Sequence, residues 1–156
     1  MRTVVAFRSD AFNRTDPKDY FINECCFGDD VGKWLILELK SRGIDVEPEP
    51  DQEDWGWYIT CRADGIEHTI GIGFRPADTE DDPGQWLCFV ERRVGLLERL
   101  RGRRKEHVVD TIPLTVHEAL RSADHVRDVR WHFKGDFDAL NEDRWAGEPN
   151  KAPSGF

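Results

Sequence analysis

Cysteine and histidine are the residues of this chain that could carry out nucleophilic or metal chemistry, but their spacing matches no known motif. No two of the four cysteines have the Cys-x-x-Cys spacing of a structural zinc site. No two of the five histidines have the His-Glu-x-x-His spacing that places two imidazoles on one face of a helix. A Gly-rich phosphate loop is also lacking. We therefore predict no catalytic residue, no metal ligand and no cofactor from motifs.

His68 is the most informative histidine, because it alternates with Ile66 and Ile70 along one face of a predicted strand. A polar ring on a buried face needs a hydrogen-bond partner. The more common arrangement is a core histidine whose nitrogens are satisfied. The alternative is a base that lowers the pKa of the Cys61 or Cys88 thiol and makes that thiol nucleophilic.

Recognition of a partner is indicated by an acidic segment that leads directly into aromatic residues. Residues 45–54 contain six acids and two prolines, and the prolines exclude a helix interior or a central strand. We predict a stiff acidic loop here. Trp55, Trp57 and Tyr58 follow at once. Carboxylates beside aromatic rings suit a protein interface, so the candidate binding residues are Asp51, Glu53, Asp54, Trp55 and Tyr58.

A basic segment contrasts with this acidic one. Residues 92–105 contain seven arginines or lysines and one acid. The usual explanation is a solvated helix face. The functional alternative is a patch for an acidic partner or a phosphate group, because the planar guanidinium pairs well with both. Arg103 and Arg104 are its candidate binding residues.

The overall composition favours one soluble domain with a basic protein as its partner. The chain has 156 residues and a formal net charge of −9, so its field repels nucleic acids and anionic membranes and attracts cations. No signal-peptide pattern and no apolar run of about 20 residues is found. We expect a cytoplasmic protein that binds neither nucleic acid nor membrane.

The elements that position these residues follow from apolar periodicity and turn signals. Strands are predicted at 3–7, 86–91 and 129–133. Helices are predicted from about 29 to 42, at 94–101 and at 116–123, the last with a capping box at Thr115 and Glu118. Residues 55–62 and 66–74 form a predicted hairpin that turns at Asp64 and Gly65. Its alternation places Trp55, Trp57, Ile59 and Cys61 on one face and Tyr58 on the other.

This element order predicts an α+β fold, with an antiparallel β-sheet and two or three helices packed on one face. Residues 1–134 are expected to form a single domain. Residues 135–156 show little apolar periodicity and are expected to form an irregular C-terminal tail.

Two stretches resemble a group of small bacterial hypothetical proteins without an established activity. The first, Phe27-Gly28-Asp29-Asp30 followed by Trp34-Leu35, lies at the start of the predicted helix. The second is Glu53-Asp54-Trp55-Gly56-Trp57. The resemblance covers about the first half of the chain and implies a bacterial source, and it assigns no functional residue.

Two classes of function therefore remain for comparison. The leading hypothesis is a non-enzymatic protein-binding domain, such as an immunity or inhibitor protein that neutralises a basic partner. The alternative is a small enzyme or ligand-binding module with a site near the central hairpin, formed by His68, Cys61 and Arg75. A third hypothesis is a subunit that forms a homodimer through Tyr58.

Overall fold

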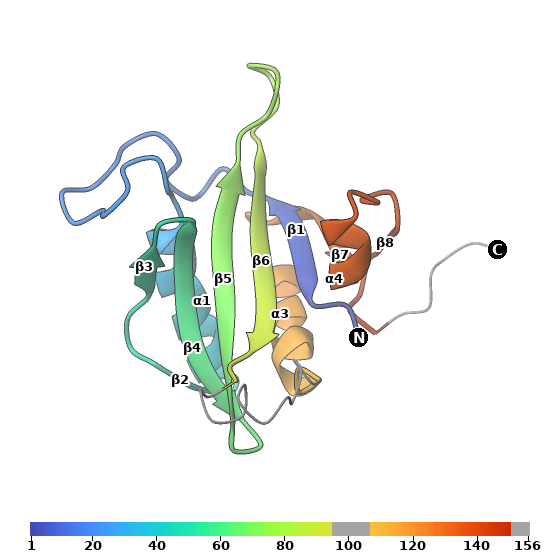
Figure 1. Ribbon diagram of the computed structural model, residues 1–156. Coiled ribbons are helices and arrows are strands. Elements are labelled where there is room, and N and C mark those ends of the chain that lie inside the picture. Colours follow the sequence, from blue (N-terminus) through green and yellow to red (C-terminus); the bar gives the residue numbers. More distant parts are fainter. Residues whose placement is uncertain (95–106, 151–156) are drawn as a thin grey trace.

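The computed structural model describes residues 1–94 and 107–150, and it confirms the expected α+β fold (Figure 1). Eight strands in this part of the chain form one antiparallel sheet, in the order β2-β4-β5-β6-β1-β7-β8 with β3 also paired to β4. The strands are β1 (Val4–Arg8), β2 (Asp45–Val46), β3 (Asp51–Glu53), β4 (Gly56–Ala63), β5 (Ile66–Arg75), β6 (Gln85–Arg92), β7 (Arg127–His132) and β8 (Trp145–Ala146). The helices are α1 (Asp29–Ser41), α3 (Thr111–Ser122) and α4 (Lys134–Asp138).

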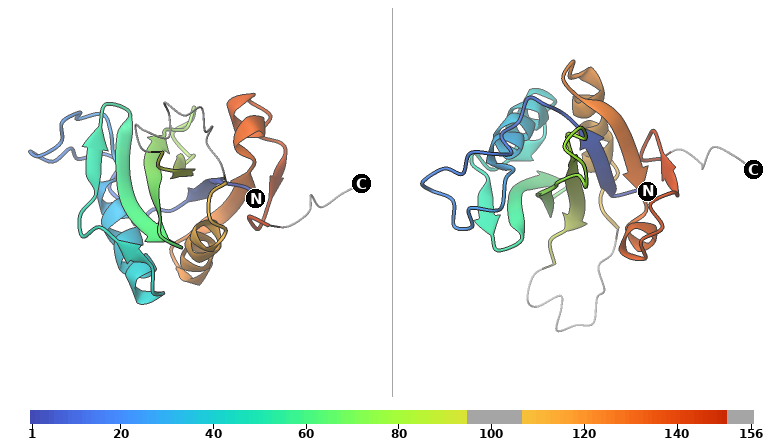
Figure 2. Two further views of the ribbon diagram at one scale, coloured as in Figure 1. Left: turned by 60° about the horizontal axis from the view of Figure 1, so that its bottom comes forward. Right: turned by 90° about the horizontal axis from the view of Figure 1, so that it is seen from above.

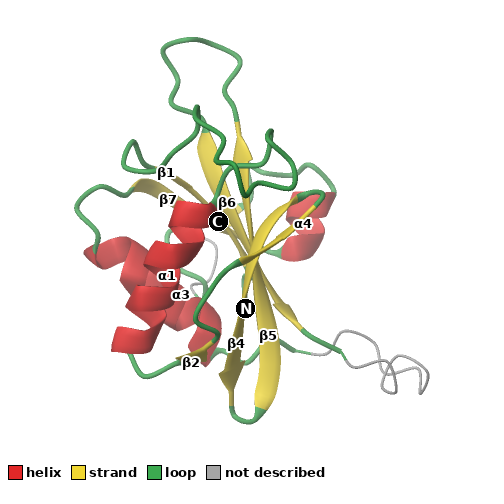
Figure 3. Ribbon diagram, turned by 90° about the vertical axis from the view of Figure 1, so that its left-hand side faces the viewer, coloured by secondary structure: helices red, strands yellow, loops and turns green. Residues whose placement is uncertain are grey.

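Two helices, α1 and α3, cover one face of the sheet, and the short helix α4 lies on the other (Figure 3). α1 begins after Gly28, carries Asp29 and Asp30 in its first turn and ends before Gly43, as the sequence predicts. Acids at the start of a helix are favoured by its dipole, and a glycine tolerates the positive φ of 84° that Gly43 adopts after the last turn. Val31, Leu35, Ile36 and Leu39 of α1 are buried in the core, whereas Leu37 is exposed.

Helix α3 begins five residues before the predicted helix, at Thr111. The predicted capping box is wrong, because Thr115 lies inside the helix, where its hydroxyl donates to the Thr111 carbonyl at 2.7 Å. Pro113 is tolerated in the first turn, since a backbone N–H there would have no partner within the helix.

The hydrophobic core lies between the sheet and these two helices. The predicted hairpin is confirmed as β4 and β5, whose register pairs Cys61 with His68, Ile59 with Ile70 and Trp57 with Ile72. All six of these residues are buried. The opposite face of the same strands carries Tyr58, Gly71 and Phe89, which follow one another across β4, β5 and β6 in register. We call this second side the open face.

The acidic segment is more ordered than the predicted loop. Asp45 and Val46 form β2, and Asp51 to Glu53 form β3, both paired with β4. Pro48 and Pro50 lie between the two short strands. The prolines therefore exclude a continuous strand, as expected, but allow two short pieces along the edge of the sheet. Figure 2 shows this edge and the opposite edge, at β8, from two sides.

Residues 135–150, which were expected to be irregular, contain two short regular elements. α4 occupies their start, and β8 pairs with β7 through Trp131 with Ala146 and His132 with Trp145. The apolar residues of this segment are too sparse to show a period, because α4 is only one turn long and β8 has two residues. The predicted helix at 94–101 and the candidates Arg103 and Arg104 lie outside the described residues.

Candidate functional site

His68 is a structural residue at the centre of the fold. Its side chain is fully buried. Nε2 accepts a hydrogen bond from the Val109 N–H at 3.1 Å, so the proton is on Nδ1, which donates to the Ile66 carbonyl at 3.0 Å. Both nitrogens are thus engaged by the backbone. Burial lowers the pKa of His68 and keeps the ring neutral. No ring nitrogen is left to act as a base towards a thiol.

The buried thiols are also unsuited to nucleophilic attack. Burial raises the pKa of Cys61 to about 12 and that of Cys88 to about 12. The thiolate, which is the nucleophile, is therefore scarce at neutral pH. Cys25 is exposed, and the Cys26 Sγ lies 3.5 Å from the Asp54 carbonyl oxygen. Burial, followed by Cys25 and Asp54, raises the pKa of Cys26 as well.

Arg75 has a structural partner rather than a free guanidinium. It forms two hydrogen bonds with the Glu142 carboxylate, at 2.7 and 2.8 Å, and also bonds to Gln85. Hydrogen bonding to Arg75 lowers the pKa of Glu142. These contacts hold the C-terminal segment against β5. Within 1–94 and 107–150, no group of three or more Cys, His, Asp or Glu side chains is placed to hold a metal ion.

Trp55 lies on the open face, although the alternation of the hairpin placed it with Trp57 on the buried face. β4 begins one residue later, at Gly56, so the alternation does not extend to Trp55. Gly56 is buried with a φ of 156°, and a Cβ there would come within 2.6 Å of the Ile72 carbonyl oxygen. This close approach requires glycine and turns the chain at Trp55.

The edge of the Trp55 indole lies over Gly71 of β5. A Cβ on Gly71 would come within 3.0 Å of the indole edge. The ring also lies 6.5 Å from that of Tyr58, centroid to centroid, and Trp55 remains 59% exposed. A large ring held against the backbone with its outer side open to solvent resembles the anchor residues of protein interfaces.

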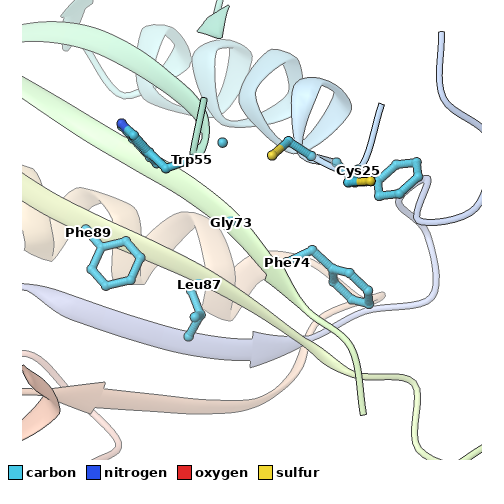
Figure 4. A pocket seen from close by; sticks show the side chains of 9 residues that line it. Cys25, Trp55, Gly73, Phe74, Leu87 and Phe89 are labelled. Carbon is cyan, nitrogen blue, oxygen red and sulfur yellow. The ribbon is translucent and has the colours of Figure 1, made fainter. Parts of the chain in front are cut away.

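Beside Trp55 the open face is hollowed into a cavity of about 220 Å³, which we call the Trp55 groove (Figure 4). Gly73 lies in the middle, with Trp55 and Cys25 on one side and Leu87 and Phe89 on the other. A Cβ at Gly73 would meet no atom within 4 Å. The groove is open because β5 carries glycine at this position.

The two sides of the groove are fixed by packing and hydrogen bonds. Phe89 packs edge to face on Phe137 of α4, with the ring centroids 5.6 Å apart. On the other side, the Trp57 indole donates to the Cys26 carbonyl at 2.9 Å, and the Asn23 amide donates to the Asp54 carbonyl at 3.1 Å. The loop that carries the two adjacent cysteines is therefore tied to the strands beneath it.

Carboxylates flank the aromatic residues on the same face. The register places Asp51 opposite Tyr58 and Glu53 opposite Gly56, and both carboxylates are exposed. The pKa of Tyr58 is raised, mainly by burial and also by the negative charges of Asp51 and Glu53. Arg93 has the opposite, smaller effect. Among the described residues, neither acid forms an ion pair. Their charge is therefore available to a cationic group.

The structure brings together five of the seven candidates from the sequence: Asp51, Glu53, Asp54, Trp55 and Tyr58. Sequence reasoning missed Gly73, Leu87 and Phe89. The alternation of the strand at 86–91 contained part of the signal, because Leu87 and Phe89 alternate with the buried Trp86 and Cys88.

Comparisons with family models, with curated proteins and with solved structures find no match to the chain. None of the described helices is both long and apolar enough to span a membrane.

Proposed function

We propose that the protein is a non-enzymatic protein-binding domain that neutralises a basic partner in the cytoplasm, as an immunity or inhibitor protein does. The observation that carries this proposal is the exposed Trp55 ring, which lies over Gly71 and is flanked by the exposed carboxylates of Asp51 and Glu53. An aromatic anchor supplies buried apolar area in an interface, and the surrounding charge selects the partner.

The side chains of the central hairpin support binding over catalysis at that place. His68 has both nitrogens bonded to the backbone, and Cys61 is buried with a raised pKa. Arg75 is held by Glu142. Each residue of the alternative enzyme site is thus engaged within the fold. The open face instead carries an exposed aromatic ring and exposed carboxylates, which are groups that an interface uses.

The two parts of the surface act on different steps of association. Exposed carboxylates steer an oppositely charged protein during encounter, which raises the association rate at low salt. The Trp55 ring acts after encounter, because its desolvation slows dissociation. Charge reversal and ring removal therefore have separable kinetic effects.

The experiment is affinity capture from cells of the natural source, followed by kinetics with the captured protein. We expect a basic protein that binds the wild-type chain. Glu53→Lys with Asp54→Lys should slow association about tenfold at low salt, and Trp55→Ala should speed dissociation by about tenfold or more.

Trp145→Ala is the matched control, because Trp145 is also a partly exposed tryptophan, 43% exposed, but lies on the opposite edge strand β8. It should leave both rates unchanged. The proposal fails if no protein is captured, or if the captured protein binds all these variants equally. A chain that instead sediments as a dimer, and as a monomer in Tyr58→Arg, supports the homodimer hypothesis.

A further inference from the structure

We infer that the Trp55 groove receives one bulky apolar side chain of the partner, with lysine or arginine next to it in the partner's sequence. This inference rests on the proposed function and deepens it. It identifies the chemistry of the segment that the partner inserts.

The size of the groove fits a single side chain. Its volume of about 220 Å³ is below the roughly 300–1,000 Å³ typical of small-molecule and cofactor pockets. It exceeds the roughly 150 Å³ cavity that accommodates a benzene ring in an engineered protein. A leucine, methionine or phenylalanine side chain is of that size. A nucleotide or another extended cofactor would not be enclosed.

The side chains that line the groove are aromatic or aliphatic apart from two thiols, and its surface also includes a comparable share of polar atoms. Leu87 and Phe89 come from a central strand, and Trp55 rests on Gly71. The thiol of Cys26 is directed to the Asp54 carbonyl, and its raised pKa keeps it uncharged. Burial of one leucine-sized side chain against such surfaces should strengthen binding about tenfold.

The charges beside the groove determine what flanks that side chain. Glu53 is paired with Gly56, a residue of the groove lining, and Asp51 lies two residues away on the same face. On the far side, Glu91 follows Phe89 at the next position of the same face of β6. Lys134 lies 3.9 Å from Glu91 and is shared with Asp138. Negative potential is therefore strongest on the Trp55 side, where a lysine or arginine next to the inserted residue would lie.

The first test uses three capped pentapeptides as probes: Lys-Lys-Leu-Lys-Lys, Lys-Lys-Gly-Lys-Lys and Glu-Glu-Leu-Glu-Glu. Binding is followed by NMR at the Trp55 indole N–H and the Gly73 amide. The leucine-centred basic peptide should bind about tenfold more tightly than the glycine-centred one, as the burial energy requires. The acidic peptide should bind weakest. Equal affinity for the leucine and glycine peptides would overturn the inference.

The second test fills the groove from within. In Gly73→Leu the new side chain enters open space, since a Cβ there meets no atom within 4 Å. Gly147→Leu is the control, because Gly147 is equally unobstructed and lies beyond β8. Gly73→Leu should reduce the affinity for the leucine peptide to that for the glycine peptide, and Gly147→Leu should not. Undiminished binding by a folded Gly73→Leu variant contradicts the inference.

The two proposals can fail separately. If a partner is captured from cells in a Trp55-dependent way but Gly73→Leu retains it, the protein-binding function stands and the groove is not the site of insertion. If the peptides are discriminated but no cellular protein is captured, the groove binds apolar side chains and the proposed function is wrong. The peptide measurement on the wild-type chain does not depend on the folding of any variant.

Discussion

At the scale of single residues, the same residue type has different chemistry in different places in this fold. Cys61 and Cys88 are buried, with their pKa raised to about 12, and behave as small apolar core residues. Cys25 lies at the edge of the Trp55 groove, where it is exposed. The number and spacing of the cysteines could not show which of them are core residues and which are accessible. The burial of each side chain in the structure does show this.

Alkylation with iodoacetamide near neutral pH should therefore modify the four cysteines at different rates. Cys25 should react first, and Cys26 more slowly, because burial and its negative neighbours raise its pKa. Cys61 and Cys88 should react only after unfolding. Peptide mass spectrometry over a time course measures the order. Fast labelling of Cys61 in the folded chain, lost in His68→Ala, would instead support the nucleophilic pair of the enzyme hypothesis.

At the scale of the elements, the hairpin of β4 and β5 depends on glycine at one position and merely permits it at another. A Cβ at Gly56 would lie 2.6 Å from the Ile72 carbonyl, whereas one at Gly73 would meet nothing within 4 Å. The Ile72 carbonyl belongs to the backbone of β5, so it cannot move aside as a flexible side chain could. The two positions lie in paired strands and make a matched comparison.

Gly56→Ala should lower the free energy of unfolding by about 2–4 kcal/mol, because the strands must separate or Gly56 must leave its φ of 156°. Gly73→Ala should change it by no more than about 0.5 kcal/mol, since glycine is a poor strand residue and the added methyl has room. Urea denaturation measures both. Similar losses in the two variants would show that the close approach at Gly56 does not matter.

The elements that the sequence predicted well are those with a long apolar period. Helix α1 and the β4–β5 hairpin were found with nearly correct bounds, because burial on one face repeats over several turns or residue pairs. β8 was not predicted, because a strand of only two residues, Trp145 and Ala146, is too short to show an alternating pattern. Trp55 was placed on the wrong face because the alternation was continued across Gly56, where the chain leaves the strand.

The candidate site was predictable on its acidic side only. Asp51, Glu53, Asp54, Trp55 and Tyr58 are close in sequence, so local pattern was enough to group them. The other side of the groove comes from β6, whose pairing with β5 is a long-range contact. Register between strands depends on the whole apolar pattern and on turn geometry. The opposition of Leu87 to Gly73 could not be found by local inspection.

At the scale of the whole molecule, three histidines link stability to pH: His68 and His132 are buried, and His117 is partly buried. His68, His117 and His132 each have a pKa lowered mainly by burial. Their rings belong to different elements, β5, α3 and β7. Each ring is kept neutral in the folded chain. Protonation therefore favours the unfolded chain, and all three histidines act in this same direction.

The free energy of unfolding should fall as the pH is lowered from about 7.5 to about 5.5. In the unfolded chain, histidines take up protons as the pH falls past about 6.5, whereas in the folded chain these three rings take them up only at lower pH. The unfolded state then binds more protons, so stability falls with decreasing pH. Urea denaturation at several pH values measures the slope. His68→Gln removes one of these groups and should flatten the slope, apart from any uniform loss of stability from the lost Val109 hydrogen bond. An unchanged slope in that variant would show that His68 does not contribute to the pH dependence.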